Sequence, residues 1–63
     1  MKLDTRTLEA TIANKSLTYK EMAANAGITE RTLQCARAGY EIRTTTAGKI
    51  ATALGLSVED ILK

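Results

Sequence analysis

A chain of 63 residues has room for one small core, so we expect residues 1–63 to form a single domain. One cysteine and no histidine exclude an intrachain disulfide and leave no ligand set for structural zinc, and we expect no cofactor. Polar and apolar residues alternate at the N-terminus, which argues against a signal peptide or a membrane span and favours a cytoplasmic protein. The net charge of +2 permits a nucleic-acid partner without requiring one.

Apolar spacing near the N-terminus predicts the first helix. Three apolar residues recur near the helical period: Leu3, Leu8 and Ile12. Either Asp4 or Thr5 can cap a helix over about residues 4–14. Four charged side chains are interpreted as solvated, with no further role: Lys2, Arg6, Glu9 and Lys63.

Two caps and one glycine delimit the next pair of helices. Thr18 and Glu21 form a TxxE capping box, in which each side chain satisfies a free amide at a helix start. Gly27 ends that helix, because glycine takes the positive φ of a C-terminal cap without steric cost. Thr29 caps the following helix, which we expect to continue to about Ala38.

A glycine stop followed by capping threonines predicts a fourth helix. Gly39 supplies the stop, and residues 40–44 form a loop. Thr44 or Thr45 then caps a helix that runs to Leu54.

A last glycine and a weaker capping pattern predict the final helix. Gly55 ends the preceding helix, and Ser57 with Asp60 opens a short helix over residues 58–62. The expected fold class is therefore all-α, with five short helices.

The segment from Tyr19 to Ala38, YKEMAANAGITERTLQCARA, fits two crossed helices joined by a glycine turn, which is a helix-turn-helix. Ala23 is small where the two helices approach most closely, and Gly27 supplies the left-handed turn. These positions are expected in the core: Met22, Ala26, Ile28, Leu33, Ala36, Ile50 and Leu54. These positions are expected to form a solvent-facing ridge that can enter a major groove: Glu30, Arg31, Thr32, Gln34, Cys35 and Arg37.

The sequence resembles the lambda-repressor-like, Cro/cI-type (XRE) helix-turn-helix family over nearly the whole chain. LTYKEMAANAGIT is similar to the family's second helix and turn, and KIATALGLSVEDIL to its fourth helix, glycine stop and fifth helix. The resemblance implies a compact five-helix fold with residues 29–38 as the recognition helix. It also implies sequence-specific binding of double-stranded DNA by a small transcriptional repressor, prokaryotic or encoded by a phage or mobile element, without a small-molecule effector.

By this resemblance, the start of the recognition helix faces base edges. Glu30, Arg31 and Cys35 fall on the positions that usually face bases, with Thr32 and Gln34 beside them. Arginine binds guanine O6 and N7 in a bidentate way, glutamine reads adenine, and glutamate accepts from cytosine N4. Arg31 is therefore the leading base reader.

The resemblance also implies two groups of phosphate contacts. Thr18 and Tyr19 match positions that touch phosphate at a helix start, and Thr29 caps the recognition helix. For Tyr19 the alternative is that its ring packs over the first helix while its hydroxyl stays solvated. A second clamp is expected after the recognition helix, from Arg43, Thr44 and Thr45.

Family members usually bind near-palindromic sites as two-fold pairs, so we expect a homodimer on DNA. Four apolar residues near the C-terminus are the expected dimer contact, although the same residues alternatively close the core: Leu56, Val58, Ile61 and Leu62.

Catalysis and protein binding are the alternatives to DNA binding. An enzyme is not expected, because no histidine is available as a base and no glycine-rich phosphate loop is present. The alternative is a protein-interaction module on the same fold, such as an antirepressor or an antitoxin. Glu30 and the small net charge favour that alternative, whereas the basic side chains Arg31, Arg37 and Arg43 favour phosphate.

Overall fold

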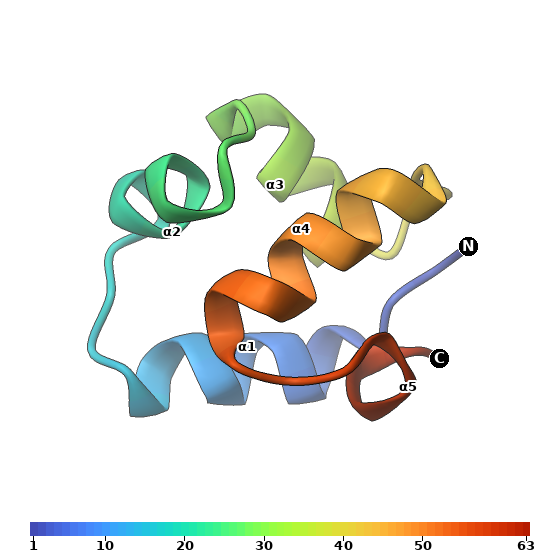
Figure 1. The fold of residues 1–63 in the computed structure, drawn as a ribbon, viewed down its shortest axis with the longest axis horizontal. Coiled ribbons are helices and arrows are strands. Elements are labelled where there is room, and N and C mark those ends of the chain that lie inside the picture. The colour runs from blue at the N-terminus through green and yellow to red at the C-terminus, as the bar shows by residue number, and fades with distance from the viewer.

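Five helices surround one core in the computed structural model, which describes the whole chain (Figure 1). They are α1 (Thr5–Asn14), α2 (Tyr19–Ala26), α3 (Glu30–Arg37), α4 (Thr44–Leu54) and α5 (Val58–Ile61). Helix α4 packs against α2 and α5, and α1 packs against α3 and α5. The structure confirms the expected all-α class and the helix-turn-helix formed by α2 and α3. None of the helices combines the length and the apolar character that crossing a membrane requires.

Side-chain caps start the first three helices where the sequence predicts them. The Asp4 carboxylate accepts from the backbone N–H of Arg6 at 3.0 Å, so Asp4 rather than Thr5 is the cap of α1. Thr18 and Glu21 form the reciprocal capping box of α2. Each cap satisfies amides that have no partner within the helix, which fixes where the chain turns.

Helix α4 starts differently, and the prediction that Thr44 or Thr45 caps it is wrong. Arg43 is the N-cap residue, with extended backbone (φ −72, ψ 151), and its side chain makes no capping bond. The cause lies one residue earlier, because the Ile42 N–H donates to the Met1 carbonyl at 2.8 Å. That pairing holds the chain extended up to Arg43, so the helix begins with Thr44.

An extended segment at the N-terminus is missing from the sequence prediction. Leu3 pairs with Leu62 in an antiparallel bridge, and the Asp4 N–H donates to the Ile61 carbonyl at 2.7 Å. Leu3 therefore lies outside α1, although its spacing suggests the helical period, and it is fully buried beside the C-terminal residues. The N-terminal segment thus closes the core against α5 and the segment before α4.

The core consists of aliphatic side chains from every helix and from the N-terminal segment. Ile28 is only partly buried, so its expected place in the core is wrong: the turn after Gly27 leaves it at the edge, packed against the core. The largest fully buried side chains are Leu3, Leu8, Met22, Leu33, Ile50, Leu54 and Ile61.

Candidate nucleic-acid interface

One side of helix α3 is anchored in the core, and the other side is exposed. Leu33 and Ala36 are buried and fix the helix against the core. Thr29 sets its start by accepting from the Thr32 N–H at 3.1 Å. The five residues predicted to read bases share the opposite side: Glu30, Arg31 and Gln34 are exposed, and Thr32 and Cys35 are half-buried. The structure thus brings these five residues together on one outward surface, which we call the α3 face.

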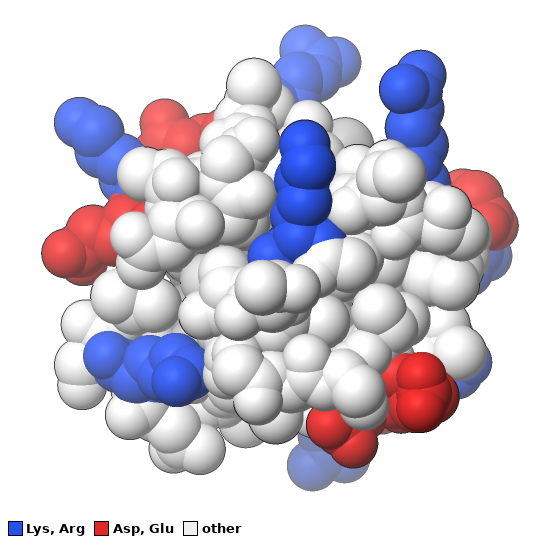
Figure 2. Space-filling model, viewed as in Figure 1, with Lys and Arg blue, Asp and Glu red and all other residues white.

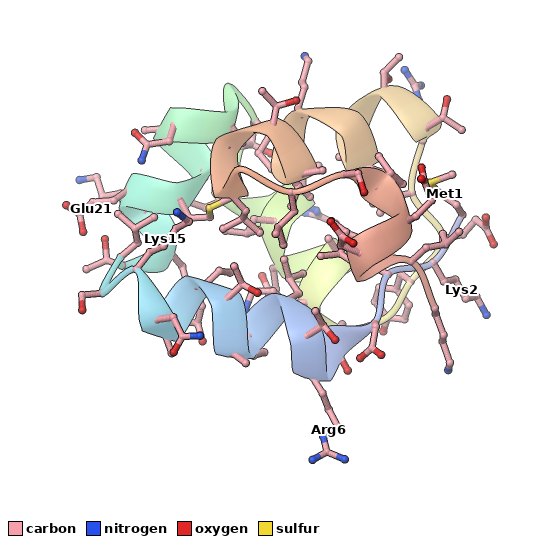
Figure 3. The ribbon with its side chains drawn as sticks, turned by 60° about the horizontal axis from the view of Figure 1, so that its bottom comes forward. Met1, Lys2, Arg6, Lys15 and Glu21 are labelled. Carbon is pink, nitrogen blue, oxygen red and sulfur yellow. The ribbon has the colours of Figure 1, made fainter.

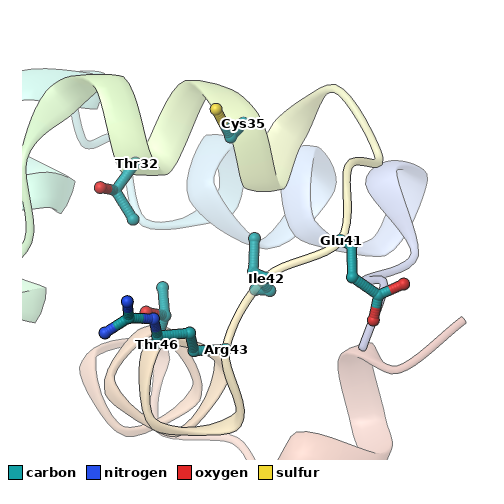
Figure 4. A pocket seen from close by; sticks show the side chains of 6 residues that line it. All are labelled: Thr32, Cys35, Glu41, Ile42, Arg43 and Thr46. Carbon is teal, nitrogen blue, oxygen red and sulfur yellow. The ribbon is translucent and has the colours of Figure 1, made fainter.

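A hollow separates the α3 face from the start of α4. Figure 4 shows Thr32 and Cys35 on α3, Arg43 and Thr46 at the start of α4, and Ile42 between them. Glu41 lines the end of the hollow, and it pairs with the N-terminal ammonium group of Met1. That ammonium group lowers the pKa of Glu41, so the carboxylate stays charged and has its own cation. Arg43 is the basic side chain among the residues that line the hollow.

The start of α4 is suited to an anion. Arg43 is exposed and provides no side-chain cap, so the backbone amides of the first turn have no partner there. Thr44 and Thr45 are exposed in that turn. Uncapped amides and the positive end of the helix dipole favour a phosphate or carboxylate.

At the start of α2, unlike the start of α4, the side chains already form intramolecular hydrogen bonds. The Thr18 hydroxyl oxygen accepts from the Glu21 N–H at 3.1 Å, and the Thr18 N–H donates to the Glu21 carboxylate. The latter bond lowers the pKa of Glu21. The Tyr19 hydroxyl donates to Glu9 at 3.1 Å, and the residue is 43 % exposed. A phosphate at this helix start would therefore meet side chains that already have partners.

Arg37 does not belong to the α3 face, and its expected place on the ridge is wrong. Its Nε donates to Glu9 Oε1 at 2.7 Å, and its guanidinium lies 3.4 Å from the centroid of the Tyr19 ring. The C-terminal turn of α3 faces α1 and the start of α2, so this arginine finds a carboxylate and an aromatic face. The interpretation of Glu9 as a charge without a role is wrong for the same reason.

Mutual hydrogen bonding shifts both pKa values in this cluster. The Arg37 guanidinium lowers the pKa of Glu9 below its ordinary 4.5, with a smaller contribution from the Tyr19 hydroxyl. Glu9 raises the already high pKa of Arg37. Both groups therefore stay charged over the whole neutral range.

Charge is unevenly distributed over the surface. Figure 2 shows basic side chains projecting from the upper edge, and acidic side chains at the upper left, at the right edge and at the lower right. Arg6 projects into solvent from α1, and Lys2 projects into solvent beside Met1 at the N-terminus (Figure 3), as expected for solvated charges. On the side of α4, the α3 face is bordered by Arg43.

The four expected dimer residues separate into three environments. Ile61 is fully buried and closes the core, which is the alternative that the sequence left open, and its carbonyl accepts from the Asp4 N–H. Leu56 and Val58 are half-buried against the core. Leu62 is 41 % exposed and is the most accessible of the four.

The sequence analysis missed one exposed residue, Tyr40, and one ion pair, Glu9–Arg37. Tyr40, directly after the glycine stop, is 64 % exposed and lies beside the α3 face. A lone aromatic residue next to a predicted recognition helix was a usable signal for it. The Glu9–Arg37 pair had no such signal, because its members lie 28 residues apart.

Together, the crossed helices α2 and α3 and the outward polar α3 face with Arg43 beside it define a helix-turn-helix DNA-binding domain. The family profile of the Cro/C1-type HTH DNA-binding domain matches residues 7–63, and the chain belongs to this family. Membership confirms the resemblance seen in the sequence and implies DNA binding and transcription regulation. No curated protein and no solved structure gives a significant match to the chain. No group of His, Cys, Asp or Glu side chains in the structure is suited to hold a metal ion.

Proposed function

We propose that the chain is a sequence-specific transcriptional repressor that binds double-stranded DNA with α3 in the major groove. The observation that carries this proposal is the α3 face, where Arg31 is exposed and makes no ion pair within the chain. An α-helix with its side chains is about 10–12 Å wide, which matches the roughly 12 Å width of the major groove.

Arg31 is the principal base reader in this proposal. It lies in the first turn of α3, the part of a recognition helix that meets base edges. Its guanidinium binds guanine, while Gln34 reads adenine and Glu30 accepts from cytosine N4. Thr32 and Cys35 lie beside them on the α3 face and make smaller contacts, such as an apolar contact with a thymine methyl group.

Phosphate contacts fix the register of α3 on the duplex. Arg43 and the uncapped first turn of α4, with Thr44 and Thr45, form the main clamp in this proposal. At the other side, Tyr19 and Thr29 contact phosphate through their backbone amides, because their hydroxyl groups already have partners. Thr18 contacts phosphate through its hydroxyl hydrogen, because its backbone amide donates to Glu21 and its hydroxyl oxygen only accepts.

We also propose that two copies bind a near-palindromic operator. One recognition helix of this length reads only a few base pairs, and a two-fold pair doubles the site. Leu56, Val58 and Leu62 are the residues available for contact between copies. The setting that fits is the cytoplasm of a prokaryote, with the gene on a phage or mobile element and no small-molecule effector.

A protein partner is the competing function. Glu30 at the start of α3 and the low net charge favour it. The two functions differ in salt dependence, because DNA binding releases counterions and apolar association between proteins does not.

The test is a titration of fluorescent random-sequence duplex at low and moderate salt, followed by selection of the operator. Binding should weaken with a log–log slope of about −0.9 per phosphate neutralised. Arg31→Ala should weaken operator binding by about 1–3 kcal/mol, or roughly 5- to 150-fold. Arg6→Ala is the matched control, because Arg6 is an exposed arginine on α1 (Figure 3). Absence of binding at low salt would overturn the proposal and direct the search to a protein partner.

A further inference from the structure

Tyr40 is an exposed aromatic residue on a fixed backbone. It is 64 % exposed, more than any other large hydrophobic residue of the chain. Its N–H donates to the Cys35 carbonyl at 3.1 Å, directly after the turn at Gly39, where φ is +84. The ring is therefore presented to solvent at a defined place beyond the end of α3.

Tyr40 lines a second hollow, which lies on the α3 face. This hollow is formed with Glu30, Arg31, Gln34, Cys35 and Ala38, whereas the first hollow contains Arg43. Cys35 lines both, so the two hollows lie on either side of it along α3. The short connection after α3 thus places Tyr40 at one flank of the α3 face and Arg43 at the other.

Two flanking hollows suit a helix that enters a major groove. The sugar–phosphate backbones form both walls of that groove, so each flank of an inserted helix faces one wall. Residues that meet base edges lie in the N-terminal part of a recognition helix, whereas Tyr40 lies beyond its C-terminal end. Tyrosine hydroxyl groups are common donors to phosphate oxygens.

We propose that Tyr40 is a DNA-backbone contact: its hydroxyl donates to a phosphate oxygen, and its ring covers the adjacent sugar. This inference rests on the proposed function and extends it, because it places a contact on the flank of α3 opposite Arg43. The other tyrosine cannot serve in the same way, since the Tyr19 hydroxyl donates to Glu9.

The experiment measures duplex binding by the whole chain as wild type, Tyr40→Phe and Tyr40→Ala. Thr52→Ala is the control, because Thr52 is an exposed neutral residue that lies in a different groove, with Asn25 and Lys49. Tyr40→Phe should weaken binding about three- to tenfold, the effect of one net hydrogen bond, and Tyr40→Ala should weaken it further. The factor should be the same on random duplex and on the selected operator, because a backbone contact carries no sequence information. The salt slope should stay unchanged, because a neutral hydroxyl neutralises no phosphate.

Each other outcome overturns the inference. If Arg31→Ala weakens binding and Tyr40→Phe matches the wild type, the Tyr40 contact is absent while the proposed function stands. A loss confined to the operator would identify a base contact instead. If the wild type binds no duplex at low salt, the proposed function fails and the Tyr40 contact fails with it. Circular dichroism of each variant verifies that the fold is intact.

Discussion

Arg31 and Arg37 lie on the same short helix, and their surroundings give them different roles. Arg31, in the first turn of α3, is exposed and makes no ion pair within the chain. Arg37, in the last turn, is bonded to Glu9 and lies over the Tyr19 ring. A guanidinium that already has a carboxylate and an aromatic face has little to gain from a phosphate.

The difference shows how one helix serves two purposes. The side of α3 that carries Leu33, Ala36 and Arg37 holds the helix on the scaffold, and the α3 face remains available for a partner. Preorganisation of this kind reduces the entropy lost on binding, because the reading side chains are presented by a fixed backbone.

Removing the apolar anchor of α3 should have the largest effect. Leu33→Ala deletes a side chain that is 1 % exposed, at a cost of about 2–5 kcal/mol. The core of a domain of this size contributes only about 3–5 kcal/mol net, so the variant should be largely unfolded at room temperature. Circular dichroism melting checks this, with the exposed neighbour Gln34→Ala as control. A melting curve for Leu33→Ala that matches the control would contradict the anchoring role.

Salt dependence separates an exposed arginine that is proposed to contact phosphate, Arg43, from the internally paired Arg37. Arg43→Ala should make the log–log salt slope of duplex binding shallower by about 0.9, because one phosphate contact is lost. Arg37→Ala should leave that slope unchanged, since its charge is already compensated by Glu9. Both variants are compared at a temperature where they remain folded. Equal changes in slope would mean that Arg37 also faces the DNA.

A smaller effect is expected from the Glu9–Arg37 pair itself. A double-mutant cycle with Glu9→Gln and Arg37→Met should give a coupling free energy of about 0.5–1 kcal/mol in urea unfolding. The pair is near the surface, which keeps the value low despite the 2.7 Å bond. A coupling energy of zero would show that the pair reflects proximity without stabilising the docking of α3.

The smallest effect is the pH dependence of that coupling. The pKa of Glu9 is lower in the folded chain than its ordinary 4.5, so the unfolded chain takes up the proton first as pH falls. The stabilisation is complete above pH 4.5 and is lost as pH falls through the lower folded-state pKa. Wild type and Glu9→Gln should therefore converge in stability in acid, as urea titrations at several pH values would show. A stability difference that grows in acid would contradict this assignment.

The sequence by itself determined the helix order and most helix ends. Caps at Asp4, Thr18 and Thr29 and glycine stops at Gly27 and Gly55 act through neighbours a few residues away, so their patterns are local and readable. The outward side of α3 followed from the same helical period, which is why the sequence already grouped its polar residues.

Contacts between distant segments were decided only by the tertiary structure. Helix α4 begins at Thr44 because Ile42 pairs with Met1, and Leu3 pairs with Leu62 in an extended segment before α1. Ile61 packs into the core, and Arg37 forms an ion pair with Glu9. None of these pairings has a signature in sequence spacing, because each depends on where the packing of α1, α3 and α5 brings remote residues together.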